Sequence, residues 1–99
     1  MTASRENILD LIEQNRDTIR GFGVRKLGLF GSWARGEQTA ESDLDFIVEF
    51  KNKSFDAYMD LKFYLEELFG CPVDLVLTDA IKPRLREAVL NEVVYAEGL

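Results

Sequence analysis

Two short stretches of this chain decide its fold and the position of its polar residues: residues 29–36 read LFGSWARG, and residues 42–48 read SDLDFIV. The first is an apolar run that stops abruptly at Gly31-Ser32. The second is an apolar run that starts with two acids, Asp43 and Asp45. The pattern predicts two strands joined by a short polar segment. A short connection favours antiparallel neighbours, which brings Gly31 and Ser32 beside the acids.

The two acids are spaced so that they share one face of the second strand. Side chains alternate between the faces of a strand, so Asp43 and Asp45 point the same way, with their Cα atoms roughly 6–7 Å apart. Two carboxylates this close raise each other's pKa unless a cation neutralises them. Mg²⁺ prefers oxygen ligands and leaves positions open for phosphates, so the pair predicts a divalent-cation site. Taken alone, the acids also fit a solvated strand edge.

The Gly31-Ser32 turn has the features of a phosphate-binding segment. Glycine lets backbone N–H groups approach a phosphate closely, and the serine hydroxyl is a further donor. The next residues are predicted to form a short helical turn, whose first N–H groups favour an anion. Arg35 is the only cation in this loop. It either forms a surface ion pair with Glu37 or Glu41, or holds the phosphates of a nucleotide with its guanidinium group.

A third acid is predicted on the same face of the sheet. Residues 55–69 have helical apolar spacing, and residues 73–77 read VDLVL, which predicts a third strand. A strand, a helix and a strand in this order imply a right-handed crossover between parallel strands. If the second and third strands are neighbours, Asp74 lies near Asp45 on the carboxylate face. The alternative is a solvated acid at the edge of the sheet.

The remaining segments complete an α/β fold in which helices pack on a small mixed sheet. A helix is predicted over residues 4–21, although Asn15 interrupts its apolar stripe. A further helix is predicted over residues 84–91, with Leu85, Ala88 and Val89 facing inward. The predicted strands are residues 24–30, 44–50, 73–77 and 93–95.

Alternation along the strands predicts two faces of different character. Alternate apolar residues from Leu44 to Phe50 form a face that packs against helices. Ile47 and Val76 fall on the opposite face, beside the acids. Because an uncovered apolar patch rimmed by charge commonly marks a protein contact, we expect part of this face to bind another protein.

Composition narrows the classes of function. The chain has 99 residues and a net charge of −6, which argues against an extended nucleic-acid interface. It contains no histidine, so Ser-His and Cys-His catalysis and histidine metal ligation are excluded. The single cysteine, Cys71, fits a reducing cytoplasm. No apolar run is long enough to predict a membrane span, so we expect a cytoplasmic protein.

The order of these motifs resembles that of a known superfamily. Gly-Ser after an apolar run, then ten residues, then Asp-x-Asp opening another apolar run is similar to the signature of DNA polymerase β-type nucleotidyltransferases. More narrowly, the chain resembles the minimal nucleotidyltransferases of prokaryotes over nearly its whole length. The resemblance implies a nucleotidyltransferase fold, with residues 1–99 as one domain. It also implies a nucleotide site at Gly31, Ser32 and Arg35.

The same resemblance implies the metal ligands, the reaction and the partner. The metal ligands would be Asp43, Asp45 and Asp74, which would hold one or two Mg²⁺ ions, or Mn²⁺. The reaction would transfer a nucleoside monophosphate to a hydroxyl group, with ATP or another nucleoside triphosphate as the donor and AMP as the expected group. Similar proteins are antitoxins that pair with a helical HEPN-domain ribonuclease toxin, and some modify a tyrosine of that toxin. Two alternatives stay open: a non-catalytic module that neutralises its partner by binding, and a nucleotide sensor without transfer chemistry.

Overall fold

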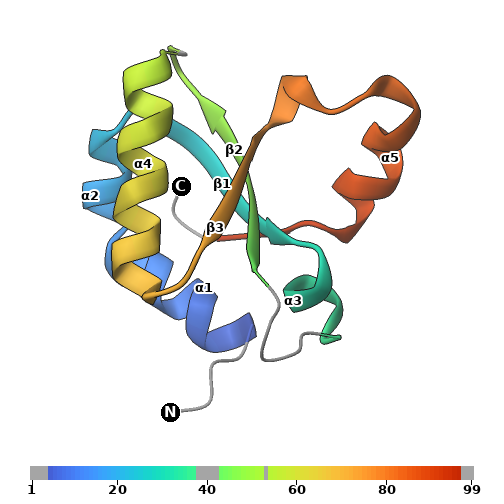
Figure 1. The fold of residues 1–99 in the computed structure, drawn as a ribbon, viewed down its shortest axis with the longest axis horizontal. Coiled ribbons are helices and arrows are strands. Elements are labelled where there is room, and N and C mark those ends of the chain that lie inside the picture. The colour runs from blue at the N-terminus through green and yellow to red at the C-terminus, as the bar shows by residue number, and fades with distance from the viewer. Residues whose placement is uncertain (1–4, 38–42, 53, 97–99) are drawn as a thin grey trace.

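The computed structural model describes residues 5–37, 43–52 and 54–96, which form helices around one four-stranded sheet (Figure 1). In chain order the elements are α1 (Arg5–Gln14), α2 (Arg16–Gly21), β1 (Val24–Phe30), α3 (Ser32–Arg35), β2 (Leu44–Phe50), α4 (Phe55–Phe69), β3 (Val73–Leu77), the 3₁₀ helix η1 (Thr78–Ala80), α5 (Pro83–Glu92) and β4 (Val94–Tyr95). Among these residues, no helix is long and apolar enough to cross a membrane.

The sheet has the order β3-β2-β1-β4. β1 is antiparallel to β2 and to β4, whereas β2 and β3 are parallel. The predicted mixed sheet, with its antiparallel first pair and parallel second pair, is therefore confirmed. The parallel pair is joined through α4, and this crossover sets the start of β3 beside the start of β2.

One face of the sheet forms the hydrophobic core. Leu27 and Leu29 of β1 and Phe46 of β2 have no exposed surface. Their side chains share this face because they alternate with the polar positions. Helices α1, α2 and α4 cover it, and all three lie on the same side of the sheet in Figure 1. Burying each large aliphatic or aromatic side chain contributes roughly 1.5–3 kcal/mol, so this face stabilises the fold.

The first helical segment differs from the prediction. The helix predicted over residues 4–21 is two helices, α1 and α2, separated at Asn15. The amide Nδ2 of Asn15 donates a hydrogen bond to the carbonyl of Leu11, 2.8 Å away. Asparagine side chains compete for backbone groups in this way, which explains the break. Ile12 and Ile19, on either side of the break, are both fully buried.

The face opposite the core is more covered than its sequence predicts. The sequence places Ile47 and Val76 on a face expected to be partly uncovered, but Ile47 has no exposed surface and Val76 is partly buried. Gly28 pairs with Ile47 in the sheet. A Cβ atom on Gly28 would overlap Val93 and would lie 3.0 Å from the ring of Tyr95. The missing side chain therefore lets the C-terminal segment close over the middle of this face.

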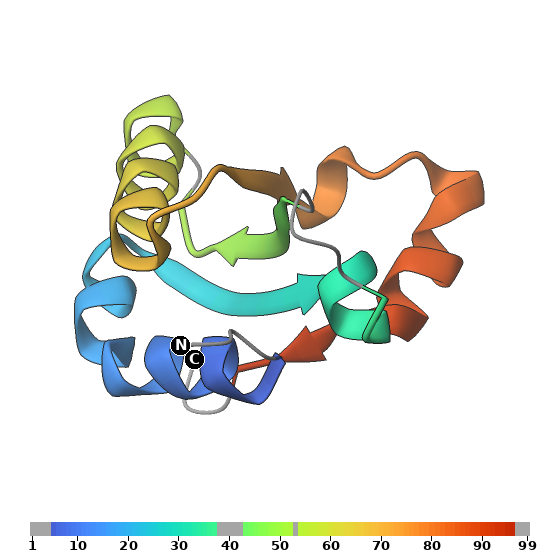
Figure 2. The same ribbon diagram turned by 60° about the horizontal axis from the view of Figure 1, so that its bottom comes forward.

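Helix α5 is also placed differently from the prediction. Leu85, Ala88 and Val89 were expected to face inward, yet none of the ten described residues of α5 is buried. Leu85 is 48% exposed. Figure 2 shows α5 standing apart from the helices that cover the core. The apolar side chains of α5 therefore pack against little else in the described part of the chain.

Candidate functional site

The turn at Gly31 joins the end of β1 directly to the carboxylate face. Gly31 has φ of 77°, a left-handed conformation that favours glycine, and α3 begins at Ser32. A Cβ atom on Gly31 would overlap the carboxylate of Asp45. Only glycine therefore fits this close approach. The predicted proximity of Gly31 and Ser32 to the acids is found, because the turn rests on Asp45 itself.

The three predicted acids come together at one end of the sheet. Asp45 pairs with Phe30 of β1 on one side and with Asp74 of β3 on the other. Asp43 lies two residues before Asp45, just ahead of the start of β2, and is exposed. Asp74 is exposed and Asp45 is partly buried. Strand register thus sets the acids of two neighbouring strands side by side, as the alternation pattern predicted.

Asp45 is the electrostatic centre of this cluster. Burial raises the pKa of its carboxyl above the ordinary value of 3.8, and the negative charges of Asp74 and Asp43 raise it further. The positive charge of Arg35 acts in the opposite direction, while Glu92 adds a further increase. The negative charges nearby outnumber the positive one. The ionised form of Asp45 is therefore disfavoured, and a bound cation would relieve this repulsion.

The donor set fits a hard divalent cation. Three carboxylates and no sulfur or nitrogen ligand are the chemistry that Mg²⁺ and Mn²⁺ select. Within the described residues, however, no ready-made group of three His, Cys, Asp or Glu side chains surrounds a metal position. The backbone brings the three acids to the same end of the sheet, but their carboxylate groups do not surround one common position. Phosphate oxygens of a nucleotide are natural additional ligands for such an open site.

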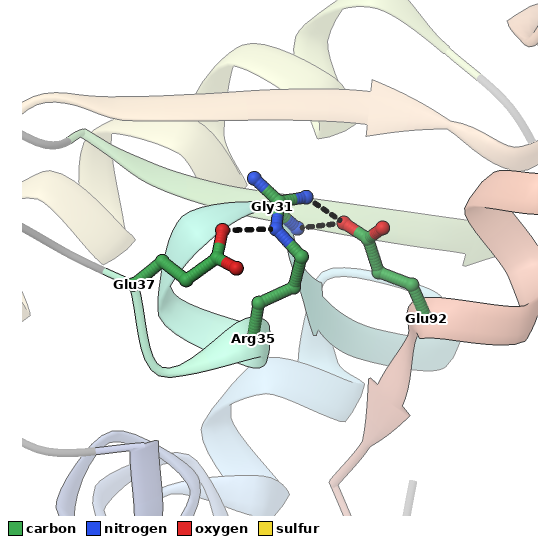
Figure 3. Close-up of polar contacts among 4 residues, drawn as sticks. All are labelled: Gly31, Arg35, Glu37 and Glu92. Atoms are coloured by element: carbon green, nitrogen blue, oxygen red, sulfur yellow. Dashed lines mark hydrogen bonds and ion pairs between the residues drawn. The ribbon is translucent and has the colours of Figure 1, made fainter.

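Arg35 contacts two carboxylates rather than one (Figure 3). Its Nε donates to Glu37 Oε2 at 2.9 Å, which is one of the two predicted ion pairs. Glu41, the other predicted partner, lies outside the described residues, as does Ser42. The Nη1 atom of Arg35 donates to Glu92 Oε1 at 2.8 Å. These acceptors raise the pKa of Arg35, so it stays cationic.

Glu92 is the functional candidate that sequence reasoning missed. Its Oε1 also accepts a hydrogen bond from the backbone N–H of Gly31, at 2.8 Å. Glu92 is the last residue of α5, 61 positions from Gly31 in the chain. No local motif indicates such a contact. Only the folded chain, which turns α5 back toward the end of β1, brings the two residues together.

The other reactive or aromatic residues near the site have structural roles. Trp33 is partly buried and packs against the hydrophobic core. Burial raises the pKa of the Cys71 thiol, and the nearby charges of Asp43 and Glu66 raise it further. A thiol held in its neutral form is a poor nucleophile. The groups that this site offers for chemistry are therefore carboxylates, backbone N–H groups and Arg35.

Comparison with known proteins gives matches over most of the chain. Residues 9–96 match the family model described as a nucleotidyltransferase domain. A protein adenylyltransferase named MntA, from Thermococcus cleftensis, is 40% identical over 92 residues, which are 91% of this chain and 93% of the relative.

Two solved structures share the arrangement of helices and strands. One, described as a candidate minimal nucleotidyltransferase, has a TM-score of 0.81 and 35% identity, and the match covers 93% of this chain and 95% of the other. The second belongs to a toxin–antitoxin crystal structure with AMP-PNP. It has a TM-score of 0.70 and 26% identity, and the match covers 98% of this chain and 75% of the other.

Proposed function

Since this chain belongs to the nucleotidyltransferase domain family, we propose that it is a metal-dependent protein adenylyltransferase that acts as the antitoxin of a toxin–antitoxin pair. The proposal takes residues 1–99 as one minimal nucleotidyltransferase domain acting in the cytoplasm. The observation that carries it is the position of Asp45, which lies against the Gly31 turn and pairs with Asp74 on the neighbouring strand.

The acids would hold the metal. Asp43, Asp45 and Asp74 would bind one or two Mg²⁺ ions, or Mn²⁺. When bound, such ions supply positive charge that offsets the charge on the attacking and leaving oxygens. The raised pKa of Asp45 supports this role, because a cation would remove the repulsion that disfavours its ionised form. The partial burial of Asp45 strengthens its attraction to a cation.

The Gly31 turn and Arg35 would bind the triphosphate of ATP. The backbone N–H of Gly31 and the guanidinium of Arg35 both donate a hydrogen bond to the same carboxylate oxygen of Glu92. These two donors are therefore placed to bind one phosphate oxygen. Ser32, at the start of α3, would add its hydroxyl. The role of these groups is to orient the triphosphate and to stabilise its charge.

The reaction replaces a phosphoanhydride bond of ATP with a phosphate ester bond to the acceptor. The oxygen of the acceptor hydroxyl forms a bond to the α-phosphorus of ATP, and the bond from that phosphorus to the β-phosphate oxygen breaks. Pyrophosphate leaves with the electron pair of that bond. The carboxylate of Asp74 accepts the proton of the hydroxyl directly. Asp74 suits this role because it is exposed at the edge strand, where an acceptor can reach it.

The acceptor would be a tyrosine of a helical HEPN-type ribonuclease toxin. Similarity to a relative named as a protein adenylyltransferase, and to a chain from a toxin–antitoxin structure with AMP-PNP, supports a protein acceptor and ATP. The net charge of −6 suits a partner with a basic surface. Exposed apolar side chains, among them Phe55 and Leu85, offer contact area for such a partner.

A specific observation favours a second candidate function. The described residues hold no ready-made metal group, and Arg35 is already paired with Glu37 and Glu92. A chain with these features could neutralise its partner by binding alone, without transfer. The two functions differ in whether the partner gains mass.

The experiment that tests the proposal is intact-mass measurement of a purified complex. The chain is co-purified with its helical partner, then incubated with ATP and Mg²⁺. We expect the partner to gain one or more adenylate units, and we expect no gain with the Asp43→Asn variant. A partner that stays unmodified in a stable complex would favour the binding module. Efficient labelling of RNA or a small molecule in place of the partner would contradict a protein acceptor.

A further inference from the structure

Glu92 occupies a position suited to an anion. One of its oxygens, Oε1, accepts a hydrogen bond from the backbone N–H of Gly31 and another from the guanidinium of Arg35, each at 2.8 Å (Figure 3). Both lengths are typical of charge-assisted hydrogen bonds. A carboxylate oxygen that receives a backbone N–H and a guanidinium N–H has the surroundings of a phosphate oxygen.

The charge of Glu92 also extends to the carboxylate cluster. Glu92 raises the pKa of Asp45, so its negative charge lies near the acids. A triphosphate bound between the Gly31 turn and the acids would bring its own negative charge to the same place. Two anions that need the same two donors exclude each other, and Glu92 must leave when a phosphate oxygen arrives.

The position of Glu92 in the fold allows it to leave. It ends α5, and none of the ten described residues of that helix is buried. Its side chain is 28% exposed, and that of Arg35 is 47% exposed. The Glu92 side chain can therefore turn toward solvent while the core holds the strands of the sheet in place.

We propose that Glu92 is an internal competitor of the nucleotide, whose carboxylate fills the triphosphate position between the Gly31 N–H and Arg35 and is displaced when ATP binds. This inference rests on the proposed function, because it takes that position to be the phosphate site. In the free protein Glu92 lowers the affinity for ATP and keeps α5 against the site. Binding of ATP releases the contact between Glu92, at the C-terminal end of α5, and the N–H of Gly31.

The experiment measures ATP affinity by calorimetry with Mg²⁺ in five proteins. These are the wild type, Glu92→Gln, Glu92→Ala, the control Glu87→Gln and the double variant Arg35→Gln/Glu92→Gln. Glutamine keeps a hydrogen-bond acceptor for the Gly31 N–H but removes the charge, whereas alanine removes both. Glu87 is an exposed acid on the same helix, so its variant reports the loss of one negative charge near the site. Adenosine, which has no phosphate, is titrated alongside.

We expect both Glu92 variants to bind ATP about two- to fivefold more tightly than the wild type, which is the range for losing a partly exposed ion pair. The gain in ATP affinity should be small in Glu87→Gln. Adenosine should bind the Glu92 variants no more tightly than the wild type. The double variant should lose the gain, because the tighter binding of ATP depends on Arg35. The melting temperature of free Glu92→Ala should stay equal to or fall below that of the wild type. Tighter ATP binding by a less stable protein distinguishes a competitor from a residue that merely holds the site in shape.

Other outcomes are equally decisive. Unchanged or weaker ATP binding in both Glu92 variants, with normal binding by the wild type, overturns the competitor while leaving the proposed function intact. An equal gain for adenosine overturns it too. Binding seen only in the Glu92 variants supports it strongly. If no protein of the series binds ATP with Mg²⁺, both this inference and the proposed function are wrong.

Discussion

The two faces of the sheet are made by alternate residues of the same strands, yet they differ in charge and in burial at the end where the acids lie. On β2, Phe46 has no exposed surface, while its neighbour Asp45 is partly exposed and has a raised pKa. The face of Phe46 is covered by three helices. The face of Asp45 carries acids, a glycine turn and an ion pair. Burial of apolar side chains on the first face stabilises the fold, whereas repulsion between the carboxylates on the second face destabilises it.

This difference teaches how a small domain carries a site. Residues whose burial stabilises the chain fix the backbone, and the backbone then holds repelling groups in register. Asp45 and Asp74 stay side by side because the core residues that follow them, Phe46 and Leu75, are the next pair of the same ladder. The four predictions below test this division, from the largest expected effect to the smallest.

The largest effect is expected on the core face. Phe46→Ala removes a fully buried ring and should lower the free energy of unfolding by about 3–5 kcal/mol. Phe63→Ala is the matched control, because Phe63 is 58% exposed. That variant should change stability by less than about 0.5 kcal/mol. Urea unfolding measures both. Equal losses in the two variants would mean that the assigned core face is wrong.

The next effect is on transfer rather than stability. Asp45→Asn removes a proposed ligand charge but keeps the shape of the side chain, so transfer to the partner should fall at least about 100-fold. Circular dichroism should show an unchanged fold. Glu49→Gln serves as the control, since Glu49 lies on the same face of β2 four residues further on. A variant at Asp45 with near wild-type transfer would remove that residue from the site.

The third prediction compares two glycines that share a positive φ but differ in ψ, which is −155° at Gly31 and 20° at Gly36. Gly31 has φ of 77° and Gly36 has φ of 73°. A Cβ on Gly31 would overlap Asp45, whereas a Cβ on Gly36 meets nothing within 4 Å. Gly36→Ala should lose about 1 kcal/mol of stability to backbone strain, and Gly31→Ala should lose more, about 1–3 kcal/mol from its backbone conformation alone. Only Gly31→Ala should also lose ATP binding. Intact ATP binding by Gly31→Ala in calorimetry would place the nucleotide elsewhere.

The smallest effect is expected on the stability of the metal-free protein, which repulsion between the acids lowers. The pKa of Asp45 is raised in the folded protein above its ordinary value of 3.8, so protonated Asp45 stabilises the fold below that pH. This stability is lost as the pH rises through the folded pKa. At pH 7 without metal, Asp45→Asn should therefore melt about 2–5 °C higher than the wild type. At pH 3 the difference should vanish. If the variant melts at a lower temperature than the wild type at pH 7, the charge of Asp45 does not destabilise the fold.

Much of this organisation could be predicted from the sequence because it follows from alternation. The strand boundaries of β1, β2 and β3, the parallel crossover and the pairing of Asp74 with Asp45 all result from apolar parity and element order. Such patterns are local, and a hydrophobic core enforces them.

The features that sequence reasoning missed depend on contacts between distant segments. Ile47 is fully buried, which no pattern around it indicates, and its sheet partner Gly28 leaves room for Val93 and Tyr95 on the same face. The inward face of α5 was predicted from spacing alone, but the helix has little to pack against among the described residues. Glu92 reaches Gly31 only after the chain has folded. Periodicity gives the face that a residue occupies, and tertiary contacts decide what covers it.

The central claim is that the carboxylate face binds a nucleotide through a metal. Calorimetry of ATP binding to the wild-type chain, with Mg²⁺ and then with excess chelator, tests it most directly, and Asp45→Asn is measured under the same two conditions. We predict binding by the wild type with Mg²⁺, at least about tenfold weaker binding in chelator, and no metal-dependent gain for the variant. Equal ATP affinity of the wild type with and without metal would contradict the account.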